Sequence, residues 1–248
     1  MTRTLRAMEL LAVRPRSAPE LAEALGVHVR TARRVLKRLD SEGYVMLTDD
    51  RRRRYRPTMR VVALAGQVVE RAELPATARA HVTALRRQLG ESCHLCVPSH
   101  LFALCLVHDE GDEAGACRPH LRELVPCHCT AAGKALLAWR EQWRDAVLEQ
   151  PLASFTERTN TGPESLRREL ARTVARGYSV EDREYEGDTR GIAAPVFAET
   201  GEAVAALAVV APVERLGAER YTEVGDAVMV AAAALSAELG HEPAVAAA

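Results

Sequence analysis

The sequence predicts an α+β fold in two parts, a small helical amino-terminal part and a larger part of antiparallel strands and helices. Three observations predict it. Residues 1–60 contain the sequence signals of several short helices, one of which has a cationic face. A helical stretch follows to about Leu89. From Cys93 onward, short apolar segments of strand length alternate with predicted helices. A chain of 248 residues, 48% of them hydrophobic, can bury a core in each part.

Charge is divided unevenly between these parts. Residues 1–60 hold 15 Lys and Arg against 7 Asp and Glu, a net charge of +8, whereas the rest holds 18 against 27, a net of −9. A basic part of this kind indicates an anionic polymer as partner, because phosphate neutralisation supplies much of the affinity for nucleic acids. A solvated arginine face is the alternative that charge alone leaves open.

The first two helices have clear local signals. An apolar repeat at helical spacing within residues 5–12 predicts the first helix. The segment "SAPELAEALGV" then begins at Ser17, where Ser17 and Glu20 have the spacing of a capping box and Gly26 is a natural stop. This second helix is expected to be only about two turns long.

A third helix is expected from about Arg30 to Glu42, after a three-residue turn. Its apolar residues share one sector and its cations lie on the opposite face, which is the arrangement that a recognition helix needs in the major groove of DNA. The sequence therefore predicts a helix-turn-helix. Its expected DNA contacts are Arg30, Thr31, Arg33, Arg34, Lys37 and Arg38.

The segment "YVMLTDDRRRRYRPT" predicts a wing behind that helix. Two short strands, residues 44–48 and 53–58, are expected to flank a polar turn at Asp49 and Asp50. A strand, a turn and a strand after a recognition helix make a wing, whose basic side chains would reach phosphates or a minor groove. These side chains are Arg51, Arg52, Arg53 and Arg54.

Residues 61–74 are expected to form a linker helix, and a further helix is expected after Pro75 to Leu89. The linker has more apolar positions than one amphipathic face needs, so a partner chain could cover the surplus. Packing within one chain is the alternative. The expected boundaries are a DNA-binding domain of residues 1–60, the linker, a second domain of residues 75–240 and a tail of residues 241–248.

The second domain is expected to contain two hairpins and a strand. One hairpin begins at Cys93 and is broken at Pro98–His100, a strand follows Gly177, and the other hairpin turns at Glu199–Gly201. Helices are expected at residues 130–139, 163–176 and 217–239. The pattern predicts an antiparallel sheet with its helices gathered to one side.

Three segments carry a family resemblance, in this order along the chain: "RTARRVLKRLDSEGYV", "VPCHCTAAGKALLAW" and "GYSVEDREYEGDTRGIAAPVFAETGEAVAALAVVAP". Over residues 3 to about 240 the chain resembles the IclR-type (isocitrate lyase regulator) transcriptional regulators. The resemblance implies a winged helix-turn-helix and a GAF-like effector-binding domain, assembled as a homodimer or homotetramer. It also implies a repressor or activator, not an enzyme, that binds double-stranded operator DNA and a small organic metabolite and needs no cofactor.

In that family the effector, typically a small organic acid, lies at the end of the sheet, near the helix that opens after "HxxxxGKA" and near the segment before "IAAPV". Small residues at a helix start leave backbone N–H groups free to bind a carboxylate, which agrees with this placement. Carried over by position, the effector-binding residues are Ala131, Ala132, Gly133, Glu181, Asp182, Thr189, Arg190, Gly191, Ala208 and Val210.

The chain departs from the family pattern at this site. Gly191 stands where a cysteine is usual, and Asp188 where a glycine is usual. Ala208 and Val210 occupy positions that are serines in regulators of small oxoacids. Because those hydroxyls are lost, we expect an effector that is larger or more apolar than glyoxylate.

A metal- or redox-responsive sensor, or an enzyme with a basic appendage, remains the alternative function. Cys127, His128 and Cys129 are consecutive, but on a strand they would not converge on one metal, and the single pair "CHLC" does not repeat. Cys127 and His128 are unsuited to act together on one substrate as nucleophile and base, and Glu181 and Asp182 would point apart on a strand. Other candidates for such a cluster are His94, Cys96, Cys105, Cys117 and His120. No metal site is expected.

The sequence predicts no membrane segment. The longest apolar runs, residues 203–212 and 227–235, are shorter than the roughly 20 residues that span a bilayer. The amino terminus carries Glu9 within its apolar stretch and lacks a small-residue cleavage site, so a secretory signal is not indicated. We expect a cytoplasmic protein whose six cysteines are reduced thiols.

Overall fold

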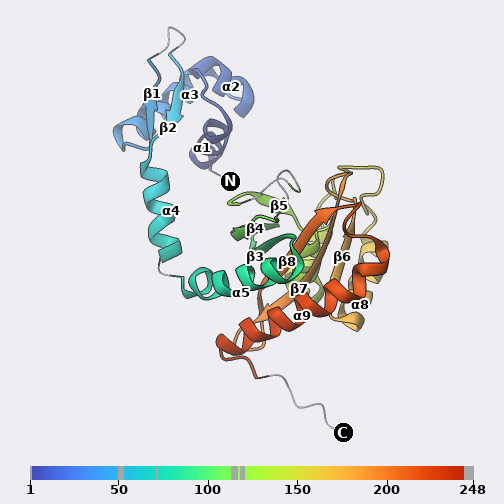
Figure 1. Ribbon diagram of the computed structural model, residues 1–248. Coiled ribbons are helices and arrows are strands. Elements are labelled where there is room, and N and C mark those ends of the chain that lie inside the picture. The colour runs from blue at the N-terminus through green and yellow to red at the C-terminus, as the bar shows by residue number, and fades with distance from the viewer. Residues whose placement is uncertain (1, 50–52, 71, 113–116, 118–120, 243–248) are drawn as a thin grey trace. The chain divides into compact units, whose positions relative to one another are not determined.

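The computed structural model describes residues 2–49, 53–70, 72–112, 117 and 121–242. The chain divides into two compact units, Met1–Ala72 and Glu73–Ala248, both drawn in Figure 1. Among the described residues, no helix is long and apolar enough to cross a membrane.

The first unit is a helix-turn-helix with a two-stranded wing. Leu11, Leu21 and Leu36, one from each of the first three helices, are at most 1% exposed and meet in one core. Backbone hydrogen bonds between Arg16 and Tyr55 attach the second wing strand to the helices. In chain order the elements are α1 (Arg3–Val13), α2 (Ala18–Leu25), α3 (Val29–Ser41), β1 (Val45–Leu47), β2 (Tyr55–Pro57) and α4 (Arg60–Glu70).

Local side-chain contacts start and stop α2 and α3. The capping box is present: the Ser17 N–H donates to the Glu20 carboxylate at 2.6 Å, and the Glu20 N–H donates to the Ser17 hydroxyl at 3.5 Å. Gly26 ends α2 with a φ of +63°, a conformation that glycine adopts without strain. His28 then caps α3, because its Nδ1 accepts the Arg30 N–H at 3.2 Å.

The second unit is an antiparallel sheet with helices. Its six strands lie in the order β5-β4-β3-β8-β7-β6. The sequence did not predict β5 or α7, which are three and eight residues long. In chain order the elements are α5 (Glu73–Leu89), β3 (Ser92–Ser99), β4 (Phe102–Asp109), β5 (Leu124–Pro126), α6 (Ala131–Trp139), α7 (Glu141–Leu148), α8 (Pro163–Arg176), β6 (Ser179–Asp182), β7 (Thr189–Phe197), β8 (Ala203–Pro212), η1 (Ala218–Arg220) and α9 (Tyr221–Glu238).

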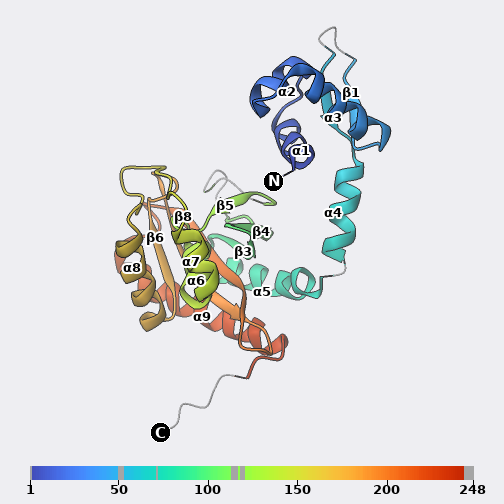
Figure 2. The same ribbon diagram turned by 180° about the vertical axis from the view of Figure 1, so that it is seen from behind.

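Helices cover both faces of this sheet, so the prediction that they gather on one side is wrong. Ile192 and Ala194 of β7 pack in the core that holds residues of α5 and α9. Ala193 between them, with Ala208 of β8, packs in the core that holds residues of α6 and α8. Figure 1 shows α9 in front of the sheet, and Figure 2, from behind, shows α6 and α7 in front of it. The physical reason is that the central strands are apolar at successive positions, and a sheet with two apolar faces must bury both.

Two prolines lie inside elements that were expected to exclude them: the hairpin strand was expected to break at Pro98, and the helix ending at Leu89 was expected to begin after Pro75. β3 continues through Pro98 to Ser99, and the hairpin turns instead at His100, whose φ is +54°. The pairing of β3 with β8 ends at Cys96, so the missing N–H of Pro98 breaks no hydrogen bond on that side. α5 begins at Glu73, which places Pro75 in the first turn, where no intrahelical N–H is needed.

α6 packs very closely on the segment that precedes it. A Cβ on Gly133 would lie 2.5 Å from the carbonyl oxygen of Cys127. That oxygen belongs to the backbone and cannot rotate away. Glycine at position 133 is therefore required for the close packing of α6 against the backbone of Cys127.

We predict that Gly133→Ala lowers the free energy of unfolding by about 1–3 kcal/mol, because the new methyl group forces α6 away from Cys127. Gly187→Ala is the matched control, since a Cβ at Gly187 meets nothing within 4 Å and should change stability by less than about 0.5 kcal/mol. Urea denaturation of both variants provides the measurement. Equal stability of the two would contradict the packing argument.

Candidate functional site

The outer face of α3 presents free positive charge. Arg30, Arg33, Arg34 and Lys37 are exposed. Among the residues that the structure describes, none of these four side chains makes a hydrogen bond or an ion pair. The opposite face of the helix is fixed in the core, so these cations are held outward and remain available to phosphates.

The other two residues predicted on α3 differ from these four. The Arg38 guanidinium pairs with the Glu42 carboxylate at 3.1 Å, and Thr31 is half-buried. Arg38 therefore lies on the cationic face with its charge already compensated.

The wing adds two described arginines to this surface. Arg53 is exposed and Arg54 half-buried, whereas Arg51 and Arg52 lie outside the described residues. Arg33, Lys37 and Arg53 line one concave surface between α3 and the wing, about 550 Å³ in volume. Arg56 is also exposed on β2, and the strand alternation of that segment could have identified it.

A cavity of about 60 Å³ lies in the second unit, beside the start of α6. Six of the ten residues predicted to bind an effector line it: Ala131, Ala132, Glu181, Thr189, Ala208 and Val210. The other lining residues are His94, Cys96, Cys105, Val125, Thr130, Tyr185 and Glu186. The sequence did not assign His94 to the effector-binding residues, because it lies on β3. Only its pairing opposite Ala208 of β8 brings it to the cavity.

The remaining four predicted residues do not line the cavity. Asp182 points away from it, as the alternation of β6 requires, and accepts the Arg190 Nε–H at 2.6 Å. Arg190 also donates to the carbonyl oxygen of Leu216 at 3.0 Å, so it supports the loop after β8. Gly191 permits close packing behind the cavity wall, since a Cβ there would lie 3.0 Å from that of Ala131. Gly133 faces Cys127, as described above.

The helix start at the cavity has uncapped backbone donors. Thr130 precedes α6 but makes no side-chain cap, because its hydroxyl donates to the Pro126 carbonyl at 2.6 Å. The first N–H groups of a helix have no acceptor within the helix. Ala131 and Ala132 thus bring apolar walls and backbone N–H groups to the same end of the cavity.

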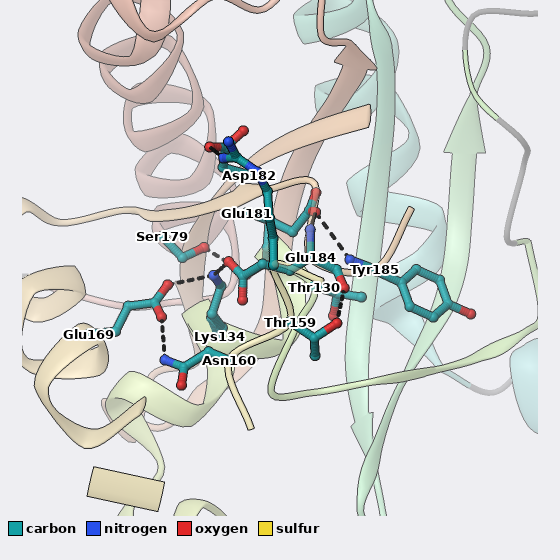
Figure 3. Close-up of polar contacts among 12 residues, drawn as sticks. Thr130, Lys134, Thr159, Asn160, Glu169, Ser179, Glu181, Asp182, Glu184 and Tyr185 are labelled. Carbon is teal, nitrogen blue, oxygen red and sulfur yellow. Dashed lines mark hydrogen bonds and ion pairs between the residues drawn. The ribbon is translucent and has the colours of Figure 1, made fainter. Parts of the chain in front are cut away.

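Glu181 is a buried carboxyl group on the cavity wall, only 4% exposed. Its Oε1 accepts the N–H groups of Glu184 at 2.6 Å and Tyr185 at 3.3 Å, in the loop drawn in Figure 3. Burial nevertheless raises the pKa of Glu181 to about 8. The cavity therefore carries a protonated carboxyl group at neutral pH, which can donate a hydrogen bond as well as accept one.

Lys134, one turn into α6, is fully buried below the cavity. Its ammonium group donates to carboxylate oxygens of Glu169 and Glu184, each at 2.5 Å, and Asn160 holds the other oxygen of Glu169 at 3.1 Å (Figure 3). Burial favours the neutral amine, but the two carboxylates together raise the pKa of Lys134. The group stays charged and joins α6, α8 and the loop after β6.

Among the residues that the structure describes, the cysteines and histidines form no metal-binding cluster. No group of three metal-binding side chains is placed to hold an ion within the described part of the chain, which leaves out His120. Residues 127–129 are not a strand, so the expected alternation does not apply, and all three are buried. Burial raises the pKa of the Cys127 thiol well above its usual value and that of Cys117 to about 12, which disfavours the reactive thiolate.

We predict that Glu181→Gln stabilises the protein increasingly as pH rises from about 4.5 to 8. In that window the unfolded chain has lost the Glu181 proton and the folded chain retains it, so ionisation favours unfolding by up to about 1.4 kcal/mol for each pH unit. The glutamine has no proton to lose and can still accept the two N–H groups. Thermal unfolding of the wild type and the variant at pH 5 and pH 8 measures this stabilisation. A difference in melting temperature between the two proteins that is the same at both pH values would contradict the raised pKa.

Comparisons with known proteins identify the family. Residues 66–237 match the model of the bacterial transcriptional regulator IclR C-terminal domain, and residues 3–56 match a helix-turn-helix domain. The chain is 32% identical over 223 residues to the glycerol operon regulatory protein of Streptomyces coelicolor, covering 89% of this chain and 87% of that protein.

Solved structures agree with the sequence matches. An IclR-type transcriptional regulator from a Silicibacter species superposes with a TM-score of 0.84 at 25% identity, covering 97% of this chain and 96% of that one. An IclR homologue from Microbacterium hydrocarbonoxydans, solved in complex with 4-hydroxybenzoate, superposes with a TM-score of 0.77 at 28% identity, covering 96% and 97%. The chain therefore belongs to the IclR family of transcriptional regulators and is a DNA-binding regulator of that type, not an enzyme.

Proposed function

We propose that α3 enters the major groove of double-stranded operator DNA while the wing contacts the neighbouring backbone. The observation that carries this proposal is the set of four cations on α3 that have no partner among the described residues. Phosphate contacts position a regulator on DNA, and base contacts then select the sequence. Such a protein acts where the DNA is, in the bacterial cytoplasm.

We propose further that the cavity binds a small organic effector that is more apolar than glyoxylate. Ala208 and Val210 supply apolar walls, and Glu181 and His94 supply polar groups for one or two hydrogen bonds. The homologue that binds 4-hydroxybenzoate supports an aromatic acid as the effector class. The cavity of about 60 Å³ is small for a ring, so its lining must shift as the ligand enters.

The regulator is proposed to act as a homodimer or homotetramer. Val62, Leu64 and Val68 on α4 are 50%, 51% and 66% exposed, an apolar surface that a second copy would bury. Effector binding would then change the separation of two winged units and thereby the affinity for an operator.

We predict that Arg34→Ala or Lys37→Ala weakens binding to the DNA upstream of the gene by about 1–3 kcal/mol if the side chain contacts a base. If it contacts a phosphate instead, the slope of log affinity against log salt falls by about 1. Fluorescence anisotropy at several salt concentrations distinguishes the two. Arg79→Ala, which removes an exposed charge from the other unit, is the control, and a loss as large as in the α3 variants would argue against recognition by α3.

We predict that Ala132→Leu abolishes the response to effector and leaves DNA affinity within about twofold, because the added atoms fill the cavity. The effector is first identified by thermal shift with 4-hydroxybenzoate, benzoate and glyoxylate, since a ligand at 100 times its dissociation constant stabilises by about 2.7 kcal/mol. Ala132→Ser nearly conserves the volume and should keep the response. An unchanged ligand affinity in Ala132→Leu would place the effector elsewhere.

A further inference from the structure

A groove of about 360 Å³ lies between α8 and the edge strand β6, apart from the cavity. Arg168, Arg172 and Arg176 line it from α8. Residues four apart on a helix are neighbours on one face, so the three guanidinium groups form a row along the groove. Asn160 and Ser165 add neutral polar groups at one end.

The carboxylates in the groove make their ion pairs with cations outside this row. Glu169 and Glu184 share the buried ammonium group of Lys134, and Asp182 accepts from Arg190 and from Arg158, at 2.6 Å each. Arg168 and Arg172 make no hydrogen bond or ion pair with any residue that the structure describes. The groove thus retains unpaired positive charge in a unit whose sequence is acidic.

The row is also electrostatically strained. Like charges four residues apart on a helix repel each other. Burial lowers the pKa of Arg176 and the neighbouring Arg172 adds to that effect, while Tyr178 and Glu169 act in the opposite direction. The Arg176 guanidinium lies 5.0 Å from the centre of the Tyr178 ring and its Nε–H donates to the Tyr178 carbonyl oxygen at 2.5 Å, which restrains its position in the row. An anion between the arginines would relieve it.

We propose that this groove is a binding site for a small, multiply charged anion, with arginines 168 and 172 as its principal ligands. Guanidinium groups donate paired hydrogen bonds to phosphate or carboxylate oxygens, and the row spaces them for a ligand with two such groups. The site goes beyond the proposed effector function, because it shares no lining residue with the apolar part of the cavity.

One loop joins the groove to the cavity. The Glu184 side chain lines the groove, while its backbone N–H donates to Glu181 on the cavity wall. The neighbouring Tyr185 lines the cavity itself. An anion in the groove therefore acts on the same short segment as an effector in the cavity, and the two ligands are coupled through it.

The test is calorimetric titration of the full-length protein with inorganic pyrophosphate and, separately, with succinate, at constant ionic strength. We expect saturable binding of one anion per chain for at least one probe. Because charge-assisted contacts from two guanidinium groups are lost, the double variant Arg168→Gln/Arg172→Gln should bind that probe at least about tenfold more weakly. Binding of pyrophosphate alone would identify a phosphorylated ligand, and binding of succinate alone a dicarboxylate.

Arg167→Gln is the matched control, because Arg167 lies on the same helix but pairs with Asp145 at 3.0 Å. It should change anion affinity by less than about twofold. The double variant should also melt no lower than the wild type without anion, since it removes like-charge repulsion. Absence of saturable binding, equal loss in the control, or a lower melting temperature of the double variant would overturn the proposal. DNA binding by the double variant stays normal in either case, which separates this test from that of α3.

Discussion

The buried ammonium group of Lys134 is the interaction on which the second unit depends. A charge removed from water is tolerated only when partners compensate it closely, and here two carboxylates, Glu169 and Glu184, do so at 2.5 Å each. These partners come from α8 and from the loop after β6. The ion pairs therefore join α6, α8 and that loop, and removal of Lys134 would leave two neighbouring carboxylates without their shared counter-ion.

The cavity beside the start of α6 depends on this arrangement. Once Lys134 fixes α6, Ala131 and Ala132 at the helix start face the ends of β7 and β8, and the close approach leaves room for little besides small side chains. Glu181 lies between the two regions, because its carboxyl group lines the cavity and accepts N–H groups from the loop that carries Glu184. A ligand that shifts this loop would therefore also disturb the contact between Glu184 and Lys134.

The DNA-binding unit uses a different principle. Its core is built from the apolar faces of three short helices, each of which contributes a buried leucine. This core buries the apolar side of α3, so the cations on the opposite side point outward. The four outward cations have no partner among the described residues, and in the proposed complex DNA phosphates would neutralise them. The groove on α8 likewise presents arginine side chains without partners among the described residues, although the sequence of that unit is acidic.

The sequence alone determined the helix-turn-helix, the wing, most strands and the family, because capping boxes, glycine stops and apolar periodicity act over a few residues. It also indicated six of the cavity residues, on the strength of the family resemblance. Tertiary structure alone decided that His94 joins them, since only the pairing of β3 with β8 brings it there. It also decided that Gly133 serves packing, that helices cover both sheet faces, and that Lys134 is a buried ion pair, because close approach and compensation of charge depend on residues far apart in the chain.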